Sequence, residues 1–331
     1  MQHDVVGLGN AIMDAIVRIE DDAVLTRLGL TRGQMHPVDD ARWREVFQGV
    51  EHLGVEMASG GSCANTICTM ALLGAPAIYC GQIGSDTFGE AYARSMAETC
   101  GGHALVRTDG HGTGKCLSLV SVRDGERTML TDLGAAVLLP TIGDFGQKVR
   151  QAKLMHLTGY LFLDGPIREA ALEAVRIAKG AGVSVSLDVA DPFVARTKTD
   201  DMRRLLQQVA RIGFLNREEA EIVTGLPAHE AVEEIGRWCE VAVVKLGGQG
   251  SLVRTGGRTY EVPVFKVPVV DTTGAGDCYA GGFLYGWMHG WSPDRAGELA
   301  SRVAALTVKQ LGAVCRDRAA MHHARDAVAG A

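Results

Sequence analysis

The chain has 331 residues, of which 47% are hydrophobic and 22% are charged, and its formal net charge is −6. This composition is ordinary for a globular protein of one or two domains, and the negative charge argues against a general binder of nucleic acid or of anionic membranes. No apolar run approaches the roughly 18 residues of a membrane span, and the N-terminus has no secretory-signal pattern. The eight cysteines are scattered without a Cys-x-x-Cys pair, so we expect reduced thiols in a cytoplasmic protein.

The first strand is predicted at residues 4–9, a short apolar run. Its Gly-x-Gly sequence is typical of dinucleotide-binding loops, but Ile12 stands at the place of the third glycine and no amphipathic helix follows, so this interpretation is disfavoured. Asn10 and Asp14 flank the end of the strand, where open α/β sheets bind ligands, and their side chains are suited to hold sugar hydroxyls. Turn formation would explain both residues equally well.

A glycine pair, Gly60 and Gly61, precedes the apolar segment 66–73, for which we predict a helix. Glycines at this place would let a ligand approach the backbone closely, and Asn65 would point from the first turn of the helix. Residues 77–83 are then predicted as a strand, and a helix is predicted at 86–97.

A hairpin is predicted next, because two alternating segments, 113–122 and 127–130, are separated by the turn sequence Arg-Asp-Gly-Glu. These strands interrupt the order of strand and helix that the rest of the chain follows. Together with residues from about 15 to 36, they would form a small separate sheet, a lid over the main part of the protein.

From residue 154 onward, strands and helices alternate regularly. The predicted strands are 154–158, 183–188, 212–215 and 241–246, and the predicted helices are 167–180, 200–210, 217–224 and 231–239. Such alternation implies parallel strands joined by right-handed helical crossovers. Segments 251–254 and 258–265, separated by a Thr-Gly-Gly turn, predict an antiparallel hairpin at the edge of the sheet.

A glycine-rich stretch that precedes an apolar run near residue 283 predicts an anion site. Gly274, Ala275 and Gly276 let successive backbone N–H groups crowd together, and a helix that starts there would direct its positive end at a phosphate. Asp277 would repel that phosphate if binding were the only purpose, so we interpret it as the base for a hydroxyl that attacks phosphorus. The alternative is that Asp277 caps the helix.

Three further features fit phosphoryl transfer. Asn216 and Glu219 share the first turn of a helix directly after a strand, where they would hold Mg²⁺ through water or form a capping pair. Lys245 begins a turn rich in glycine, which would be a flat shelf for a nucleotide or a plain hairpin turn. Arg127 in the lid hairpin would reach a transferring phosphoryl group, although a surface arginine is the commoner case.

The two glycine segments, in their order and separation, resemble the two signatures of the PfkB family of carbohydrate and nucleoside kinases, at 59–89 and 271–282. The resemblance covers nearly the whole chain and implies a ribokinase-like α/β fold, a doubly wound, mainly parallel sheet with helices on both faces and a small β-sheet lid. We expect one kinase unit over residues 1–331. Its large domain would comprise residues 1–14, 37–54, 59–102 and 134–331, and its lid about 15–36, 55–58 and 103–133.

The resemblance also implies the roles of residues around the phosphate. Asp277 would be the catalytic base, and the Gly-Ala-Gly before it would be the anion hole. Asn216 and Glu219 match the family's Asn-x-x-Glu motif, which organises Mg²⁺ and phosphate, and Arg127 matches a phosphate-binding position of the lid in adenosine kinases.

A nucleotide site is implied by the same resemblance. The turn from Lys245 to Gly250, with Gly247, matches the family's nucleotide-binding shelf for ATP, although the family often has Thr where this chain has Lys245. The family sometimes uses a monovalent cation such as K⁺ near the loop that would contain Asp271 and Thr273.

The expected substrate site is similar to that of adenosine kinases. Residues that match Asp14, Gly61 and Asn65 hold the ribose hydroxyls there, and Asn10 and Gly60 belong to the same pattern. The lid segment 126–133 is also similar. An apolar pocket for a flat base would be formed by Met35, Met129, Leu133 and Tyr160.

We therefore expect an ATP-dependent kinase that phosphorylates the 5′ hydroxyl of a nucleoside, adenosine foremost. One alternative is a sugar kinase of the same family, for ribose, fructose or 2-keto-3-deoxygluconate. A second is a protein that binds nucleotide or sugar without catalysis, which the presence of Asp277 argues against. Either way we expect a small-molecule substrate, no nucleic acid or membrane partner, and a monomer or homodimer.

Overall fold

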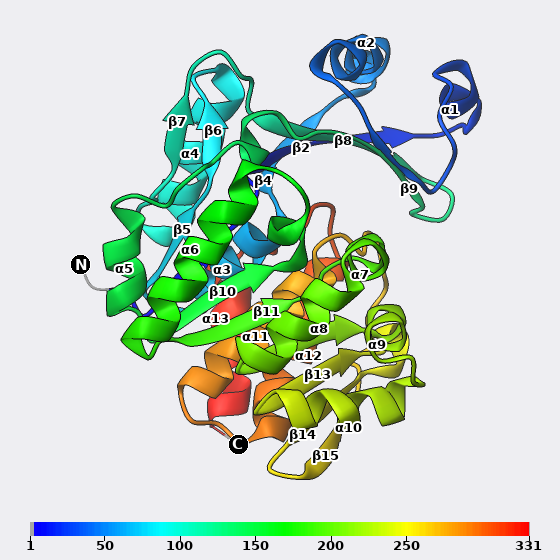
Figure 1. The fold of residues 1–331 in the computed structure, drawn as a ribbon. Coiled ribbons are helices and arrows are strands. Elements are labelled where there is room, and N and C mark those ends of the chain that lie inside the picture. Colours follow the sequence, from blue (N-terminus) through cyan, green and yellow to red (C-terminus); the bar gives the residue numbers. More distant parts are fainter. Residues whose placement is uncertain (1–2, 331) are drawn as a thin grey trace.

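The main sheet of the protein has parallel strands with one antiparallel hairpin at its edge (Figure 1). The computed structural model describes residues 3–330. From edge to edge the strands are β15 (Arg258–Val262), β14 (Ser251–Thr255), β13 (Val241–Lys245), β12 (Ile212–Asn216), β11 (Ser184–Asp188), β10 (Leu154–Thr158), β1 (Val5–Leu8) and β5 (Ala77–Cys80). From β5 across to β13, each strand pairs parallel with the next one in the sheet. β14 pairs antiparallel with β13 and forms the predicted hairpin with β15.

Helices cover both faces of this sheet, as the doubly wound prediction requires. One buried cluster contains side chains of α3 (Ser62–Leu72), α4 (Thr87–Cys100), α11 (Ala275–Met288), α12 (Pro293–Val308) and α13 (Arg318–Ala329). The other contains side chains of α5 (Phe145–Gln151), α6 (Pro166–Ala181), α7 (Pro192–Thr197), α8 (Thr199–Gln208), α9 (Arg217–Thr224) and α10 (Ala228–Trp238). Among the helices of residues 3–330, none has the length and apolar character to cross a membrane.

The order of the strands reverses at β1. The chain leaves β1 toward β5 on one side and later returns to β10 on the other side. In open α/β sheets, ligands bind beyond the carboxyl ends of the strands at such a reversal. Asn10 lies just after β1, so the fold places it at this point.

A second, five-stranded sheet stands apart from the main one (Figure 1). Its strands are, in order, β3 (Met35–Pro37), β9 (Arg127–Asp132), β8 (Gly114–Ser121), β2 (Ile12–Ile19) and β4 (Glu56–Gly60). Helices α1 (Ala23–Arg27) and α2 (Asp40–Val50) pack on one face of it. We expected residues 37–54 in the large domain, but Trp43, Val46 and Val50 of α2 are buried against this sheet, because their apolar stripe matches its alternating face.

The register of the small sheet determines which of its side chains face the cleft, by which we mean the space between this sheet and the loop at residues 269–272. Alternate residues of β2, such as Ala15 and Val17, are buried under α2. The opposite face therefore carries Asp14 beside Cys116, and Ile16 beside Ser118 and Met129. Met35 adds to the second of these rows because it pairs with Met129.

The segment predicted as one strand at 77–83 is divided between two sheets. β5 belongs to the main sheet, whereas β6 (Gln82–Gly84) pairs with β7 (Val106–Thr108). The change occurs at Gly81, where a Cβ atom would lie 2.7 Å from the carbonyl oxygen of Gly9. We expected residues 106–108 in the lid, but they lie in this separate pair of strands.

Candidate active site

Asp277 lies in the first turn of α11. Its carboxylate accepts hydrogen bonds from Ser62 Oγ at 2.6 Å and from Asn65 Nδ2 at 2.9 Å. Burial raises the pKa of Asp277 to about 6, although the two hydrogen bonds and the charge of Lys245 act in the opposite direction. A carboxylate with this pKa is ionised at neutral pH and is still basic enough to accept a proton.

The turn before Asp277 requires glycine. Gly274 has a φ of +69° and precedes α11, and a Cβ atom there would lie 2.2 Å from the carbonyl oxygen of Ala313. No side chain caps the N-terminus of α11. The backbone N–H groups of Ala275 and Gly276 thus lie at the positive end of a 14-residue helix, an arrangement that suits an anion.

The glycine pair that precedes α3 makes room for the two polar residues after β1. A Cβ atom on Gly60 would lie 2.0 Å from Oδ2 of Asp14, and one on Gly61 would lie 2.2 Å from the carbonyl oxygen of Asn10. The predicted substrate residues Asn10, Asp14, Gly60, Gly61 and Asn65 are therefore brought together. Burial raises the pKa of Asp14 to about 7, with Arg127 opposing this shift and Asp271 and Asp277 adding to it.

Arg127 connects the small sheet to the loop before α11. Its Nη1 donates a hydrogen bond to Oγ1 of Thr273, and its Nε lies 3.7 Å from Oδ1 of Asp271. Arg127 thus contacts the residue next to the glycine turn at Gly274, and its role as a phosphate-binding arginine stays a prediction.

Asp271 organises that loop. Its carboxylate accepts hydrogen bonds from the backbone and the hydroxyl of Thr273 and, at 3.0 Å, from the backbone of Gly312. These bonds account for the buried position of Asp271, and a monovalent cation beside it stays a prediction.

Asn216 and Glu219 form a complete capping box at the start of α9. Both carboxylate oxygens of Glu219 accept hydrogen bonds from Asn216, and Asn216 Oδ1 accepts one from the Glu219 backbone. Burial raises the pKa of Glu219 to about 8. In the described part of the chain, no three Asp, Glu, His or Cys side chains are grouped to hold a metal ion. Contact of this pair with Mg²⁺ through water stays a prediction.

A cavity of about 550 Å³ opens beside the anion turn, the name we give to residues 274–276 at the start of α11. It is lined by the turn after β13, with Lys245, Gly247 and Gly250, and by Ala275 and Gly276 of α11. Apolar side chains of α12 and of residues 262–269 complete its wall. The predicted nucleotide shelf thus borders the predicted anion hole.

The apolar residues expected around the substrate are only partly together. Met129 and Met35 are neighbours on the cleft face of the small sheet, and Leu133 follows β9. Met35 and Leu133 are 46% and 43% exposed. The hydroxyl of Tyr160 donates to Oδ2 of Asp191 at 2.9 Å, and burial and the nearby carboxylates of Asp191, Asp277 and Glu219 raise the pKa of Tyr160. Its place in an apolar substrate pocket stays a prediction.

Ser62, Asp188 and Asp191 are site residues that the sequence reasoning missed. Asp188 ends β11, and its Oδ2 accepts a hydrogen bond at 2.6 Å from Lys245 Nζ. Between the two aspartates, Ala190 has a φ of +73°, a conformation that is costly for a residue with a side chain and is found mostly at functional sites. An acidic residue at the end of a predicted parallel strand was a signal available in the sequence.

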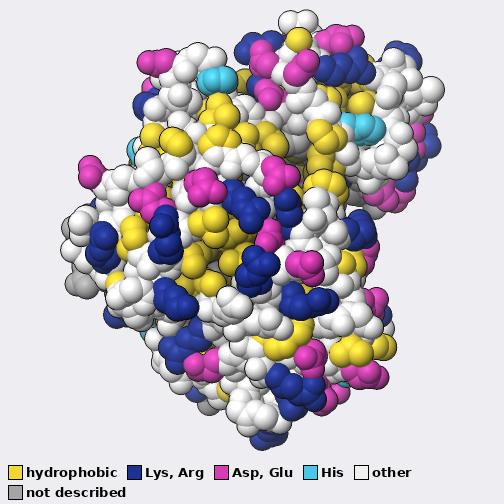
Figure 2. Space-filling view, in the orientation of Figure 1, with side chains coloured by type: hydrophobic (Ala, Val, Ile, Leu, Met, Phe, Trp, Pro, Cys, Tyr) yellow, Lys and Arg dark blue, Asp and Glu magenta, His cyan; other side chains and the backbone are white. Residues whose placement is uncertain are grey.

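The surface around the site has no single-sign patch on the face that Figure 2 shows, where acidic and basic side chains are interspersed. Between the small sheet and the loop at 269–272 there is a second cavity, of about 680 Å³, lined by Arg18, Arg127 and Met129 among others.

Comparisons with known proteins agree with this geometry. The family model of the pfkB family carbohydrate kinases matches residues 43–317. The solved structure of the adenosine kinase from Sinorhizobium meliloti is 32% identical with a TM-score of 0.90, and the match covers 99% of this chain and 100% of that one. A probable sugar kinase from Rhizobium etli CFN 42 is 30% identical with a TM-score of 0.88, over 98% of both chains.

Among curated proteins, the similar sequences include kinases that are named for a sugar acid and not for adenosine. The 5-dehydro-2-deoxygluconokinase of Shouchella clausii (strain KSM-K16) is 32% identical over 263 residues, which are 76% of this chain and 80% of that protein. The relatives therefore share one fold and one type of reaction but carry the names of different acceptors.

Proposed function

This chain belongs to the pfkB family of carbohydrate kinases, whose members phosphorylate a hydroxyl group, and from that membership we propose that it transfers the γ-phosphoryl group of ATP to the 5′ hydroxyl of a nucleoside, adenosine foremost. The similarity to the Sinorhizobium meliloti adenosine kinase over the whole chain supports this substrate class. The specific support comes from the polar atoms of the cleft.

Two buried acceptor atoms beside the glycine pair lack a donor among residues 3–330. They are Oδ1 of Asn10 and Oδ1 of Asn65, and the carboxylate of Asp14 lies against the adjacent Gly60. Buried acceptors without donors are costly. A ligand with neighbouring hydroxyl groups, such as a ribose, would satisfy them, and this is the observation that carries the proposal.

The cleft face of the small sheet favours an uncharged substrate with an apolar part. The row of Ile16, Ser118 and Met129 is apolar or small, and flexible methionine adapts to a flat base. Cations on this face, Arg18 and Arg127, lie in an outer row on either side of Val120. A neutral nucleoside therefore fits the inner rows better than an acid.

A sugar acid is the second candidate. The similarity to 5-dehydro-2-deoxygluconokinase favours it, and so does Arg18, because no ion pair to Arg18 occurs among the described residues while it lines the 680 Å³ cavity. A carboxylate that reached the outer row would find a free cation there.

In the proposed reaction, Asp277 takes the proton of the attacking hydroxyl. The hydroxyl oxygen forms a bond to the γ-phosphorus while the bond between that phosphorus and the bridging oxygen breaks, and ADP leaves. The N–H groups of Ala275 and Gly276 and the guanidinium of Arg127 stabilise the charge of the transferring group. Mg²⁺ would neutralise phosphate charge, with Asn216 and Glu219 in contact through its water.

The test is a panel of acceptors with ATP, in which ADP formation is measured for adenosine, guanosine, inosine, cytidine, ribose, fructose, 2-keto-3-deoxygluconate and 5-dehydro-2-deoxygluconate. We expect the highest kcat/KM for adenosine, and a loss of kcat of at least about 10²-fold in Asp277→Asn. A higher kcat/KM for a sugar acid than for every nucleoside would overturn the substrate proposal, and only the kinase activity would stand. Binding of ATP without turnover of any acceptor would indicate a binding protein instead.

A further inference from the structure

The ammonium group of Lys245 lies beside the anion turn. Lys245 is the last residue of β13, and a Cβ atom on Gly276 would come 3.2 Å from its Nζ. The same side chain lines the 550 Å³ cavity, and its charge reaches Asp277, whose pKa is raised by burial and lowered by Lys245. Lys245 thus lies between the expected nucleotide and the expected base.

Asp188 holds this ammonium in place. Nζ of Lys245 lies 2.6 Å from Oδ2 of Asp188, whose side chain is 1% exposed. The other oxygen, Oδ1, accepts a hydrogen bond at 3.1 Å from the backbone of Ala190, the residue with the left-handed conformation. The carboxylate is therefore fixed by its own loop, and the lysine cannot leave it without losing a buried partner.

Lys245 still has donors to offer. An ammonium carries three N–H groups, and among residues 3–330 Asp188 is the one acceptor within hydrogen-bond distance of Nζ. The side chain is only 15% exposed. A buried cation with unused donors, next to a helix N-terminus that has no side-chain cap, is arranged to receive an anion.

We infer that Lys245 binds an oxygen of the γ-phosphoryl group of ATP, and that Asp188 is a positioning residue that holds the ammonium over Gly276. This inference rests on the proposed phosphoryl transfer from ATP. When the bond from the bridging oxygen to the γ-phosphorus breaks and the bond from the acceptor oxygen forms, the proton goes to Asp277 and the fixed cation stabilises the oxygens of the group in transit. Glycine at 276 keeps open the space that the ammonium occupies.

The competing explanation is that the ion pair only ties β11 to β13. The two explanations predict different results for a variant in which both charges are removed together. A buried pair that serves stability alone can be replaced by neutral side chains without loss, whereas a phosphate-binding lysine cannot.

The experiment measures the affinities of ATP and ADP by calorimetry in Lys245→Met, in Asp188→Asn and in the double variant. These measurements need no acceptor, so they stay informative if the proposed substrate is wrong. We expect Lys245→Met to weaken ATP binding about 10- to 100-fold, the effect of a charged hydrogen bond, with ADP binding almost unchanged. Lys153→Met is the matched control, because Lys153 pairs with Asp4 at 3.1 Å on the surface, and it should change neither affinity.

The double variant decides the outcome, since it buries neither charge and should fold even where Lys245→Met does not. Weak ATP binding in the folded double variant supports the inference, and affinity for ATP equal to that of the unmodified protein overturns it. With an active acceptor, the acid limb of the kcat/KM profile should move to higher pH in Lys245→Met, because Lys245 lowers the pKa of Asp277. An unmoved limb would contradict the placement of the charge.

Discussion

Asp277 shows how a carboxylate becomes a base through its neighbours. Burial raises the pKa of Asp277, and the bonds from Ser62 and Asn65 counter this effect. Both donors come from α3, so the first glycine segment sets the basicity of a residue in the second. The first glycine segment therefore lies next to the second one and also lowers the pKa of its carboxylate.

The pH profile tests this partnership. Because the base must be ionised, kcat/KM should fall as the pH drops below about 6, the pKa of Asp277. Ser62→Ala removes a bond that lowers this pKa, so the acid limb should move to higher pH by roughly one unit, equivalent to about 1.4 kcal/mol. Thr66→Val is the control, since Thr66 Oγ1 donates to the backbone carbonyls of Ser62 and Asp277 and not to the carboxylate; an equal shift there would show that the effect is not specific to the carboxylate.

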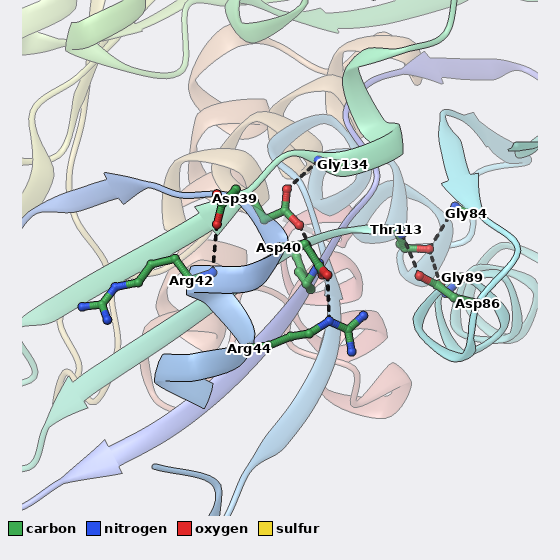
Figure 3. A network of polar contacts seen from close by, with 11 residues as sticks. Asp39, Asp40, Arg42, Arg44, Gly84, Asp86, Gly89, Thr113 and Gly134 are labelled. Atoms are coloured by element: carbon green, nitrogen blue, oxygen red, sulfur yellow. Dashed lines mark hydrogen bonds and ion pairs between the residues drawn. The ribbon is translucent and has the colours of Figure 1, made fainter. Parts of the chain in front are cut away.

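At the scale of elements, a buried lysine joins the helices and strands of the small sheet. Lys115 of β8 is 2% exposed and lies 2.6 Å from Asp132 of β9 and 2.7 Å from Asp40 of α2. Figure 3 shows that Asp40 also accepts a hydrogen bond from Arg44. It shows as well that the backbone N–H of Gly134 donates to Oδ1 of Asp132, just after β9. This network attaches α2 to strands β8 and β9 and to Gly134.

Replacing Lys115 should therefore destabilise the small sheet. Lys115→Met leaves the largely buried Asp132 without its partner, and we expect a loss of about 3 to 5 kcal/mol in the free energy of unfolding, measured by urea denaturation. Arg44→Ala breaks the exposed pair with the same Asp40 and should cost less than about 1 kcal/mol. Equal costs for the two variants would show that burial of the network is not what matters.

At the scale of the whole molecule, the buried carboxyl groups of the site make the free energy of unfolding depend on pH. Burial raises the pKa of Asp277 to about 6, of Asp14 to about 7 and of Glu219 to about 8. Between the ordinary carboxyl pKa near 4 and these values, the three carboxyls bind more protons in the folded protein than in the unfolded chain. His156 acts in the opposite direction below its ordinary pKa of 6.5, because burial lowers its pKa to about 3, but it is one group against three. The free energy of unfolding should consequently fall as the pH rises through this range.

Unfolding experiments at pH 5 and pH 8 measure this slope, which is roughly 1.4 kcal/mol per pH unit for each whole proton. Asp14→Asn removes one titrating group, so its stability should depend less on pH and should exceed that of the unmodified protein at pH 8. A free energy of unfolding that rises from pH 5 to pH 8 would contradict the raised pKa values of the three carboxyl groups. Because Asp14 is a proposed substrate residue, the same variant should have a higher KM for the acceptor.

Much of the fold was predictable because local patterns and tertiary structure agree. The strand at 154–158 and the helix at 217–224 have the predicted ends, since apolar runs and capping residues there act locally. By contrast, residues 37–54 were expected in the large domain, and residues 77–83 were expected as one strand, although α2 packs on the small sheet and β6 pairs with β7. Local sequence does not tell which sheet an amphipathic helix will cover or where a strand leaves its sheet.

By itself, the sequence determined the family, the fold class and the kind of reaction, because glycine turns and an acidic residue at a helix start carry their chemistry locally. Only the tertiary structure decided how those parts act on one another. It brought α3 to Asp277, and it showed that Asn216 and Glu219 form a capping box. It also paired Lys245 with Asp188, and such pairs between distant strands arise from the sheet order, which no local pattern records.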